Sequence, residues 1–213
     1  MRPRVILKVA TSLDGRIATA SGESQWITGE AARLQGHRLR AAHDAILVGV
    51  ETVLADDPRL TTRLPDGETG ADPLRVVLDS RLRTPDFARL AKPGTLIVTT
   101  REPKAIGGAE VVQVAGDANG RPTVDAVLAL LAERGVKSML IEGGGRVAAC
   151  FVGAGVVDAL EWFRAPMLLG GDGRPCIAML ALKRLAHAPK FRRLAVEPLG
   201  DDLWERYEAV QGV

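Results

Sequence analysis

The sequence predicts an α/β protein with a mainly parallel central sheet flanked by helices and an antiparallel hairpin near the C-terminus. Short apolar runs alternate with helical patterns along most of the 213 residues, as in chains that build parallel sheets. Residues 191–198 and 202–210 flank the turn Leu-Gly-Asp, a spacing typical of a hairpin. The composition has neither a shift nor a long linker, so residues 1–213 are expected to form a single domain.

The strands are predicted from apolar runs that are too short for helices. The run at residues 45–50 is apolar throughout, which is typical of a strand buried on both faces. In chain order, the predicted strands are residues 5–10, 45–50, 74–80, 95–100, 110–115, 138–142 and 159–169, followed by the two hairpin strands.

Helical patterns fill the gaps between these runs. The clearest covers residues 124–134, where apolar residues share one face, Thr123 provides an N-cap and Gly135 ends the helix. A short helical turn before Pro58 is also predicted. The other predicted helices cover residues 30–42 and 147–155, and residues 64–73 are rich in turn formers and predict an exposed loop.

The composition is that of a globular chain, with 46% hydrophobic and 25% charged residues. A net charge of +2 argues against a nucleic-acid or membrane surface. No signal peptide and no membrane-spanning apolar stretch is found, so a cytoplasmic location is expected. Cys150 and Cys176 lack a C-x-x-C spacing and are expected to be buried, reduced thiols.

A glycine run, Gly143-Gly-Gly-Arg-Val-Ala148, lies between a predicted strand and a predicted helix. Glycines let backbone N–H groups approach a phosphate, and the start of the helix carries a partial positive charge. A generic strand–turn–helix is the competing interpretation, and Glu142 beside the loop opposes an anion. A Rossmann domain is disfavoured, because too little chain follows for the second half of one.

Two charged residues stand at strand positions. Lys8 interrupts an apolar strand, and it is either an edge or snorkelling lysine or a partner of a carboxylate or substrate. Glu142 stands at the C-terminal end of a strand, where ligands bind in α/β sheets. The hypothesis is that these two residues stabilise a developing charge and move a proton during catalysis.

Three segments carry a resemblance to a known family: LKVATSLDGRIATASGESQWIT, LRAAHDAILVGVETVLADDPRLTTR and LIEGGGRVAACFVGAGVVDALEWFRAPMLLGG. Together they resemble the reductase domain of bacterial riboflavin biosynthesis proteins, which has a dihydrofolate-reductase-like fold. The resemblance implies an NADPH-dependent reduction of the ribosyl group of a 5-amino-6-(5-phosphoribosylamino)pyrimidine to a ribityl group. Hydride would reach C1′ of the sugar in an open-chain imine form. The resemblance also implies a homodimer and no metal or flavin.

The resemblance also assigns site residues. Lys8 and Glu142 match the family's positions at the reacting end. The implied cofactor-binding residues are Ala10, Trp26, Thr52, Asp56, Ser80, Gly144, Gly145, Arg146 and Val147, with the loop and helix start extending to Cys150. The implied substrate-binding residues are Ser24, Arg40, Leu60, Arg63 and Glu142.

Several alternatives stay open. Taken singly, Arg40, Arg59 and Arg63 are expected to be solvated surface charges, although converging arginines suit a sugar phosphate. The resemblance reverses this expectation for Arg40 and Arg63 and leaves Arg59 uncertain. Trp26 is either a core plug or a flat wall for a ring, and Asp14 is either a turn residue or a structural anchor of the site. His37, His43 and His187 show no ligand or triad spacing, and His37 and His43, which flank the end of the first helix, are expected at the surface.

The function has open alternatives as well. The zinc signature of the deaminase that bacterial relatives often carry is not found in these 213 residues, so a stand-alone reductase is expected. One alternative is a reductase of another small carbonyl, imine or pteridine-like compound. The other is a non-catalytic module that binds NADPH.

Overall fold

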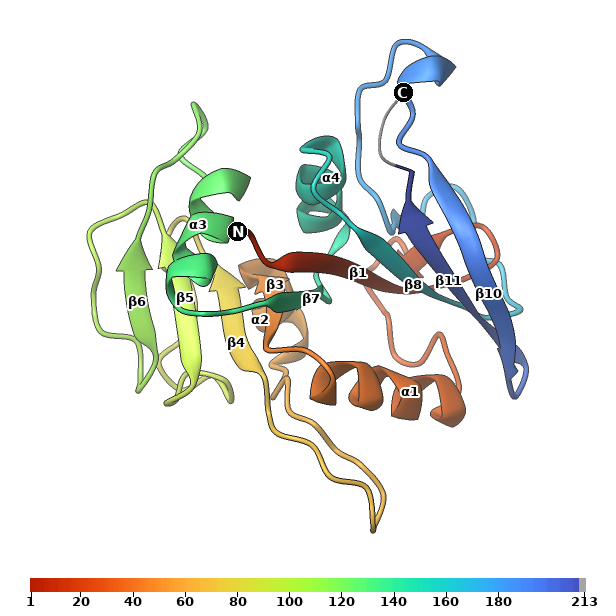
Figure 1. Ribbon diagram of the computed structural model, residues 1–213, viewed down its shortest axis with the longest axis horizontal. Helices are drawn as coiled ribbons and strands as arrows, with labels where there is room; N and C mark the ends of the chain where they lie inside the picture. Colours follow the sequence, from red (N-terminus) through yellow and green to blue (C-terminus); the bar gives the residue numbers. More distant parts are fainter. Residues whose placement is uncertain (211–213) are drawn as a thin grey trace. The chain divides into compact units, whose positions relative to one another are not determined.

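The structure, a computed structural model, describes residues 1–210 and divides into two compact units (Figure 1). Unit 1 comprises Met1–Arg4 and His37–Gly143, and unit 2 comprises Val5–Gly36 and the chain from Gly144 onward. Of the three boundaries, one falls between Arg4 and Val5, one inside the first helix and one inside the glycine run. The single domain stays a prediction, and each unit is described by itself.

Unit 1 is built on five parallel strands in the order β7–β3–β4–β5–β6. In Figure 1, the strands from β3 to β6 stand side by side. Every residue of β3 and β5 is buried, which explains their unbroken apolar sequences. The strands are β3 (Ala45–Gly49), β4 (Leu74–Leu78), β5 (Thr95–Thr99), β6 (Glu110–Gln113) and β7 (Ser138–Ile141).

The helices of unit 1 follow the sequence signals closely. In α3 (Val124–Glu133), the Thr123 side chain accepts a hydrogen bond from the backbone N–H of Ala126, and Gly135 takes a positive φ just beyond the helix end. Helix α2 (Val50–Asp56) begins directly at the carboxyl end of β3. The second half of α1 (Glu30–Ala41) also belongs to unit 1.

Apart from Arg4, β1 (Arg4–Thr11) belongs to unit 2, where it pairs in parallel with β8 (Ala159–Arg164). Strand β11 (Asp202–Ala209) is antiparallel to β8 and forms the predicted C-terminal hairpin with β10 (Phe191–Leu199). The mainly parallel sheet and the antiparallel hairpin are thus confirmed. Helix α4 (Gly145–Gly153) starts two residues earlier than predicted, because Gly144 itself takes the N-cap position.

The structure adds elements that the sequence did not predict. A two-stranded pairing joins β2 (Arg16–Ala18) to β9 (Arg174–Pro175), and η1 (Leu185–His187) is a single 3-10 turn. These elements are too short for a periodic signal. Among residues 1–210, no helix is both long and apolar enough to span a membrane.

The prediction about the cysteines is half correct. Cys176 is buried, but Cys150 is exposed. Helix α4 buries Ala148, Phe151 and Val152 on one face, and Cys150 points away from that face. An apolar neighbourhood in sequence therefore does not bury a helical residue whose side chain lies on the outer face.

Candidate active site

The centre of the site in unit 1 is an ion pair between Arg40 and Glu142. Arg40 lies in the last turn of α1, and Glu142 directly follows β7, where its backbone N–H donates to the Leu47 carbonyl at 3.0 Å. The Arg40 Nε and Nη2 atoms donate to the two Glu142 carboxylate oxygens at 2.8 and 2.9 Å. The two side chains are only 17% and 8% exposed. The expectation that Arg40 taken singly is a solvated charge is therefore wrong.

This pairing defines what Arg40 offers to a ligand. Burial alone lowers the pKa of Arg40, but the Glu142 charge and its hydrogen bonds outweigh burial, so the pKa is raised and the guanidinium is charged. Arg40 Nη1 also donates to the Thr61 carbonyl at 3.2 Å. Three of the five guanidinium N–H donors are thereby used within unit 1. The two hydrogen bonds to the carboxylate fix the orientation of Glu142.

His37 is a site residue that the sequence analysis missed. Its ring is half-buried, which contradicts the expected surface position. Its pKa is lowered to about 4, first by burial and then by the charges of Arg40 and Arg63. His37 precedes Arg40 by three residues on α1, so the two side chains share a face. The three-residue spacing from Arg40 was the signal in the sequence that could have placed His37 near the site. Because its pKa is lowered, the His37 ring is neutral at neutral pH.

The carboxyl edge of the parallel strands gathers further predicted residues of unit 1. Thr52 and Asp56 lie one turn apart on α2, which starts where β3 ends, and Ser80 lies two residues after β4. Glu142 follows the end of β7 at the same edge, because parallel strands end on one side of a sheet. Although Asp56 is an exposed residue, the surrounding chain partly desolvates its carboxylate and raises its pKa.

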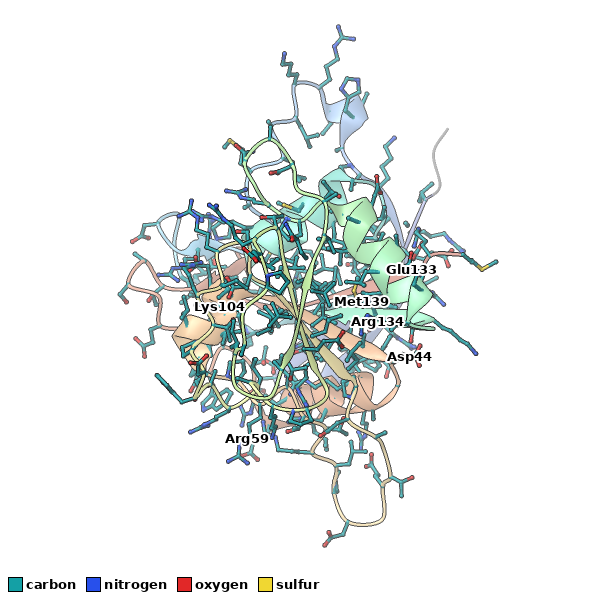
Figure 2. The ribbon with its side chains drawn as sticks, turned by 90° about the vertical axis from the view of Figure 1, so that its left-hand side faces the viewer. Asp44, Arg59, Lys104, Glu133, Arg134 and Met139 are labelled. Carbon is teal, nitrogen blue, oxygen red and sulfur yellow. The ribbon has the colours of Figure 1, made fainter. Side chains whose placement is uncertain are left out.

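Leu60 and Arg63 lie in the segment between α2 and β4. Leu60 is 4% exposed and belongs to the hydrophobic cluster of unit 1, whereas Arg63 is exposed. Arg59, which the sequence left uncertain, is exposed and points outward in Figure 2. Of these side chains, only Arg63 is both charged and electrostatically coupled to His37.

The remaining predicted residues lie in unit 2. The half-buried Lys8 side chain contacts the ring of Phe163, with 5.6 Å from its Nζ to the ring centroid. A Cβ on Gly36 would lie 3.8 Å from Nζ, so this glycine of α1 leaves room for the lysine. Trp26 is 66% exposed with the Arg33 guanidinium 4.5 Å from its ring centroid, which rules out the core-plug interpretation. Ala10 and Ser24 are half-buried.

The glycine loop uses its glycines for different reasons. A Cβ on Gly145 would collide with the Pro175 carbonyl oxygen, so Gly145 is required by packing. A Cβ on Gly144 would meet nothing within 4 Å, and this N-cap residue has no side chain to cap α4. Arg146 is exposed and Val147 is half-buried in the first turn of α4, whose first backbone N–H groups have no partner within the helix. A helix start is a general anion-binding feature, so residues 144–147 form the candidate phosphate cradle.

Asp14 is a structural anchor in unit 2. Its carboxylate accepts hydrogen bonds from the Ser12 hydroxyl at 2.6 Å and from the backbone N–H groups of Leu169 and Gly170 at 3.2 and 2.8 Å. The hydrogen bond from Ser12 is the main cause that lowers its pKa to about 2. Asp14 thus ties the loop after β1 to the loop after β8. This resolves the alternatives left open by the sequence in favour of the anchor.

Unit 2 also contains a cavity of about 170 Å³ that none of the predicted site residues lines. A buried carboxylate, Glu205, is held there by Arg164 at 2.9 Å. The lining residues are Thr11, Leu13, Trp162, Arg164, Glu205 and Tyr207.

The fold and the site define the chain first as an α/β protein of the dihydrofolate-reductase-like fold. Dihydrofolate reductase from Enterococcus faecalis matches 98% of the chain, and the chain covers 97% of that structure, with a TM-score of 0.56 and 16% identity. More particularly, the chain belongs to the family described as the RibD C-terminal domain, which matches residues 3–204. This confirms the resemblance and the fold expected from the sequence.

Individual relatives are similar over most of the chain. A 2,5-diamino-6-ribosylamino-4(3H)-pyrimidinone 5′-phosphate reductase from Methanothermobacter thermautotrophicus is 37% identical, and the match covers 97% of this chain and 98% of that protein. The riboflavin biosynthesis protein RibD of Bacillus amyloliquefaciens is 38% identical over 94% of this chain, which spans only 56% of that longer relative. The structure of Acinetobacter baumannii RibD matches with a TM-score of 0.87 and 32% identity, over 99% of this chain and 59% of that one.

Proposed function

We propose that this protein is an NADPH-dependent reductase that converts the ribosyl group of a 5-amino-6-(5-phosphoribosylamino)pyrimidine to a ribityl group. The observation that carries the proposal is the buried Arg40–Glu142 pair at the carboxyl edge of the parallel strands, with Arg63 in the adjacent loop. A sugar phosphate with a reducible carbon needs converging cations and a fixed carboxylate. The printed name of the archaeal relative, which this chain covers almost completely, supports the same substrate class.

The chemistry requires a hydride at C1′ and a proton at the neighbouring nitrogen. In the open-chain imine, the C=N double bond becomes a CH₂–NH single bond, and NADPH supplies the hydride and becomes NADP⁺. A carboxylate held by Arg40 stabilises positive charge on the imine, which is the role proposed for Glu142. Lys8 is proposed to hold or deliver the proton, in keeping with its half-buried place in β1.

Some of the cofactor-binding residues proposed from the family lie in unit 2, and the others lie in unit 1. In unit 2, Gly144, Gly145, Arg146 and Val147 offer the phosphate cradle, and Trp26 offers an exposed flat ring. In unit 1, Thr52, Asp56 and Ser80 stand at the carboxyl edge of the strands. Ser24, Leu60 and Arg63 complete the proposed substrate contacts.

The direct test is NADPH oxidation by purified protein, followed by absorbance. The phosphorylated ribosylamino-pyrimidine is supplied in its amino and its deaminated form, with NADH as the cofactor control. Oxidation with either form supports the assignment and identifies which pyrimidine is reduced. No oxidation with either form, together with calorimetric NADPH binding, would reject it and leave a reductase of another small compound or a nucleotide-binding module.

The cradle has its own test, because Gly144 has no packing reason to be glycine. Gly144→Ala should fold like the wild type and bind NADPH at least about tenfold more weakly, since its methyl group enters the proposed phosphate position. Unchanged NADPH affinity in a folded Gly144→Ala protein would remove the cradle from the cofactor site.

We also propose a homodimer in the cytoplasm and a single reductase domain that includes both units. The family match from residue 3 to residue 204 runs through both units and supports the single domain. Sedimentation equilibrium tests the dimer, and a single cooperative unfolding transition tests the domain.

A further inference from the structure

The loop at residues 61–72 is fastened to the last turns of α1. In Figure 1, this yellow-orange excursion extends from the chain between α2 and β4. The Arg38 guanidinium donates two hydrogen bonds to the Glu68 carboxylate, from Nε at 2.9 Å and from Nη2 at 2.6 Å. Each charge shifts the pKa of the other in the favourable direction, mainly through these hydrogen bonds.

Gly70 provides a second contact between the loop and α1, through close packing. A Cβ on Gly70 would lie 2.6 Å from the Cβ of Ala41 and 3.1 Å from the Leu64 side chain. The φ of Gly70 is not in the left-handed region, so space is the reason for a glycine there. The loop backbone therefore packs against the final residue of α1.

The loop is also closed at its base. The Thr62 backbone N–H donates to the Asp72 carboxylate at 2.7 Å, and the Thr62 hydroxyl donates to the Ala71 carbonyl at 3.1 Å. Thr61, one residue earlier, accepts the hydrogen bond from Arg40, and Asp72 raises the pKa of Arg40 through its charge. The closed base thus connects the loop to the Arg40–Glu142 pair, and Arg63, which directly follows Thr62 in the chain, acts on the neighbouring His37 through its charge.

We propose that Arg38, Glu68 and Gly70 are positioning residues, which hold the loop so that Arg63 and the Thr61 carbonyl stay in place beside Arg40. This inference rests on the proposed function, because it assigns the effect to binding of the phosphorylated substrate. An unfastened loop has to be ordered when substrate binds, and that ordering weakens substrate affinity. Hydride transfer from the bound complex is unaffected, because none of the three residues takes part in it.

The test compares loop variants with a matched ion pair elsewhere in unit 1. Arg134, at the end of α3, also donates two hydrogen bonds to a carboxylate, that of Glu110, from Nη1 at 2.8 Å and from Nη2 at 2.6 Å. Figure 2 shows Arg134 on another side of the unit from Arg59, which lies just before the loop. Glu110→Gln is therefore the control for losing an exposed ion pair without touching the loop.

Glu68→Gln is expected to raise KM for the phosphorylated pyrimidine about threefold, a change of the size that an exposed ion pair supplies. Gly70→Ala is expected to raise it about tenfold, because the loop must move away from Ala41. In both variants, kcat and the Kd for NADPH should stay at the wild-type values. The charge reversal Arg38→Glu with Glu68→Arg should recover part of the KM, and Glu110→Gln should change nothing.

Hydrogen exchange of the amides of residues 62–72 gives a readout that does not depend on turnover. Faster exchange in Glu68→Gln and Gly70→Ala, but not in Glu110→Gln, is expected. Wild-type KM in both loop variants of an active enzyme, or wild-type exchange in both, would overturn the inference. If the wild type reduces neither pyrimidine, the proposed function fails, and with it the assignment of the loop to that substrate, while exchange still decides whether these residues hold the loop.

Discussion

Helix α1 carries two arginine–glutamate pairs only two residues apart, and they differ in burial rather than in geometry. Arg40 holds Glu142 at 2.8 and 2.9 Å, and Arg38 holds Glu68 at 2.9 and 2.6 Å. The side chains of the first pair are 17% and 8% exposed, whereas those of the second pair are 45% and 37% exposed. Bidentate contact is thus common to both pairs, and solvent access separates them.

The difference teaches what each pair is able to do. Removing one partner of a buried pair leaves an uncompensated charge out of water, which is costly. An exposed pair exchanges its partner for water and ions at little cost, so it adjusts local order rather than overall stability. The difference in burial agrees with the roles proposed above, the chemistry for Arg40–Glu142 and the loop for Arg38–Glu68.

The largest expected effect comes from breaking the buried pair Arg40–Glu142, the inner pair. Glu142→Gln should reduce kcat/KM by about 10²–10³, because it removes the carboxylate proposed to stabilise the reacting imine. It should also lower the free energy of unfolding by about 3 kcal/mol, because Arg40 is left buried without its counterion. Steady-state kinetics and denaturant unfolding measure both effects, with Glu68→Gln as the matched control. Near-normal turnover in folded Glu142→Gln would contradict the assignment.

A second prediction concerns the coupling within each pair. A double-mutant cycle of Arg40→Ala and Glu142→Gln should give a coupling free energy of about 2 kcal/mol in unfolding. The same cycle for Arg38→Ala and Glu68→Gln should give a clearly smaller value, about 0.5 kcal/mol, as is usual for an exposed pair. Equal couplings would show that burial does not distinguish the pairs.

The third prediction concerns His37, the neutral histidine near the Arg40–Glu142 pair. The pKa of His37 is lowered to about 4 in the folded protein from about 6.5 in the unfolded chain, first by burial. As pH falls from 6.5 to 4, the unfolded chain binds this proton while the folded protein does not, so stability falls across that window. Unfolding titrations should show that His37→Gln flattens this part of the pH profile. An identical slope in wild type and His37→Gln would assign the loss to other groups.

The smallest expected effect is that of salt on the exposed pair Arg38–Glu68. The threefold KM difference between Glu68→Gln and wild type should shrink as ionic strength rises, because salt screens the exposed pair in the wild type. The difference between Glu142→Gln and wild type should persist. A salt-independent Glu68→Gln effect would indicate that the loop responds to something other than this ion pair.

Most of the fold was predictable, because its signals are local. The unbroken apolar runs of β3 and β5 identify strands of a covered parallel sheet, and Thr123 with Gly135 marks the ends of α3. The short β2–β9 pairing was not predictable, since strands of three and two residues carry no period. The family resemblance supplied the site residues, but not their relations to one another.

The sequence by itself determined the α/β class, the order of the main elements and the family, because periodicity, caps and a long motif are properties of contiguous residues. The tertiary structure alone decided that Arg40 and Glu142 form a buried pair across 102 positions of sequence. It also decided that His37 is half-buried beside them and that Cys150 is exposed. These outcomes depend on which faces are covered when distant elements pack, and no local pattern records that.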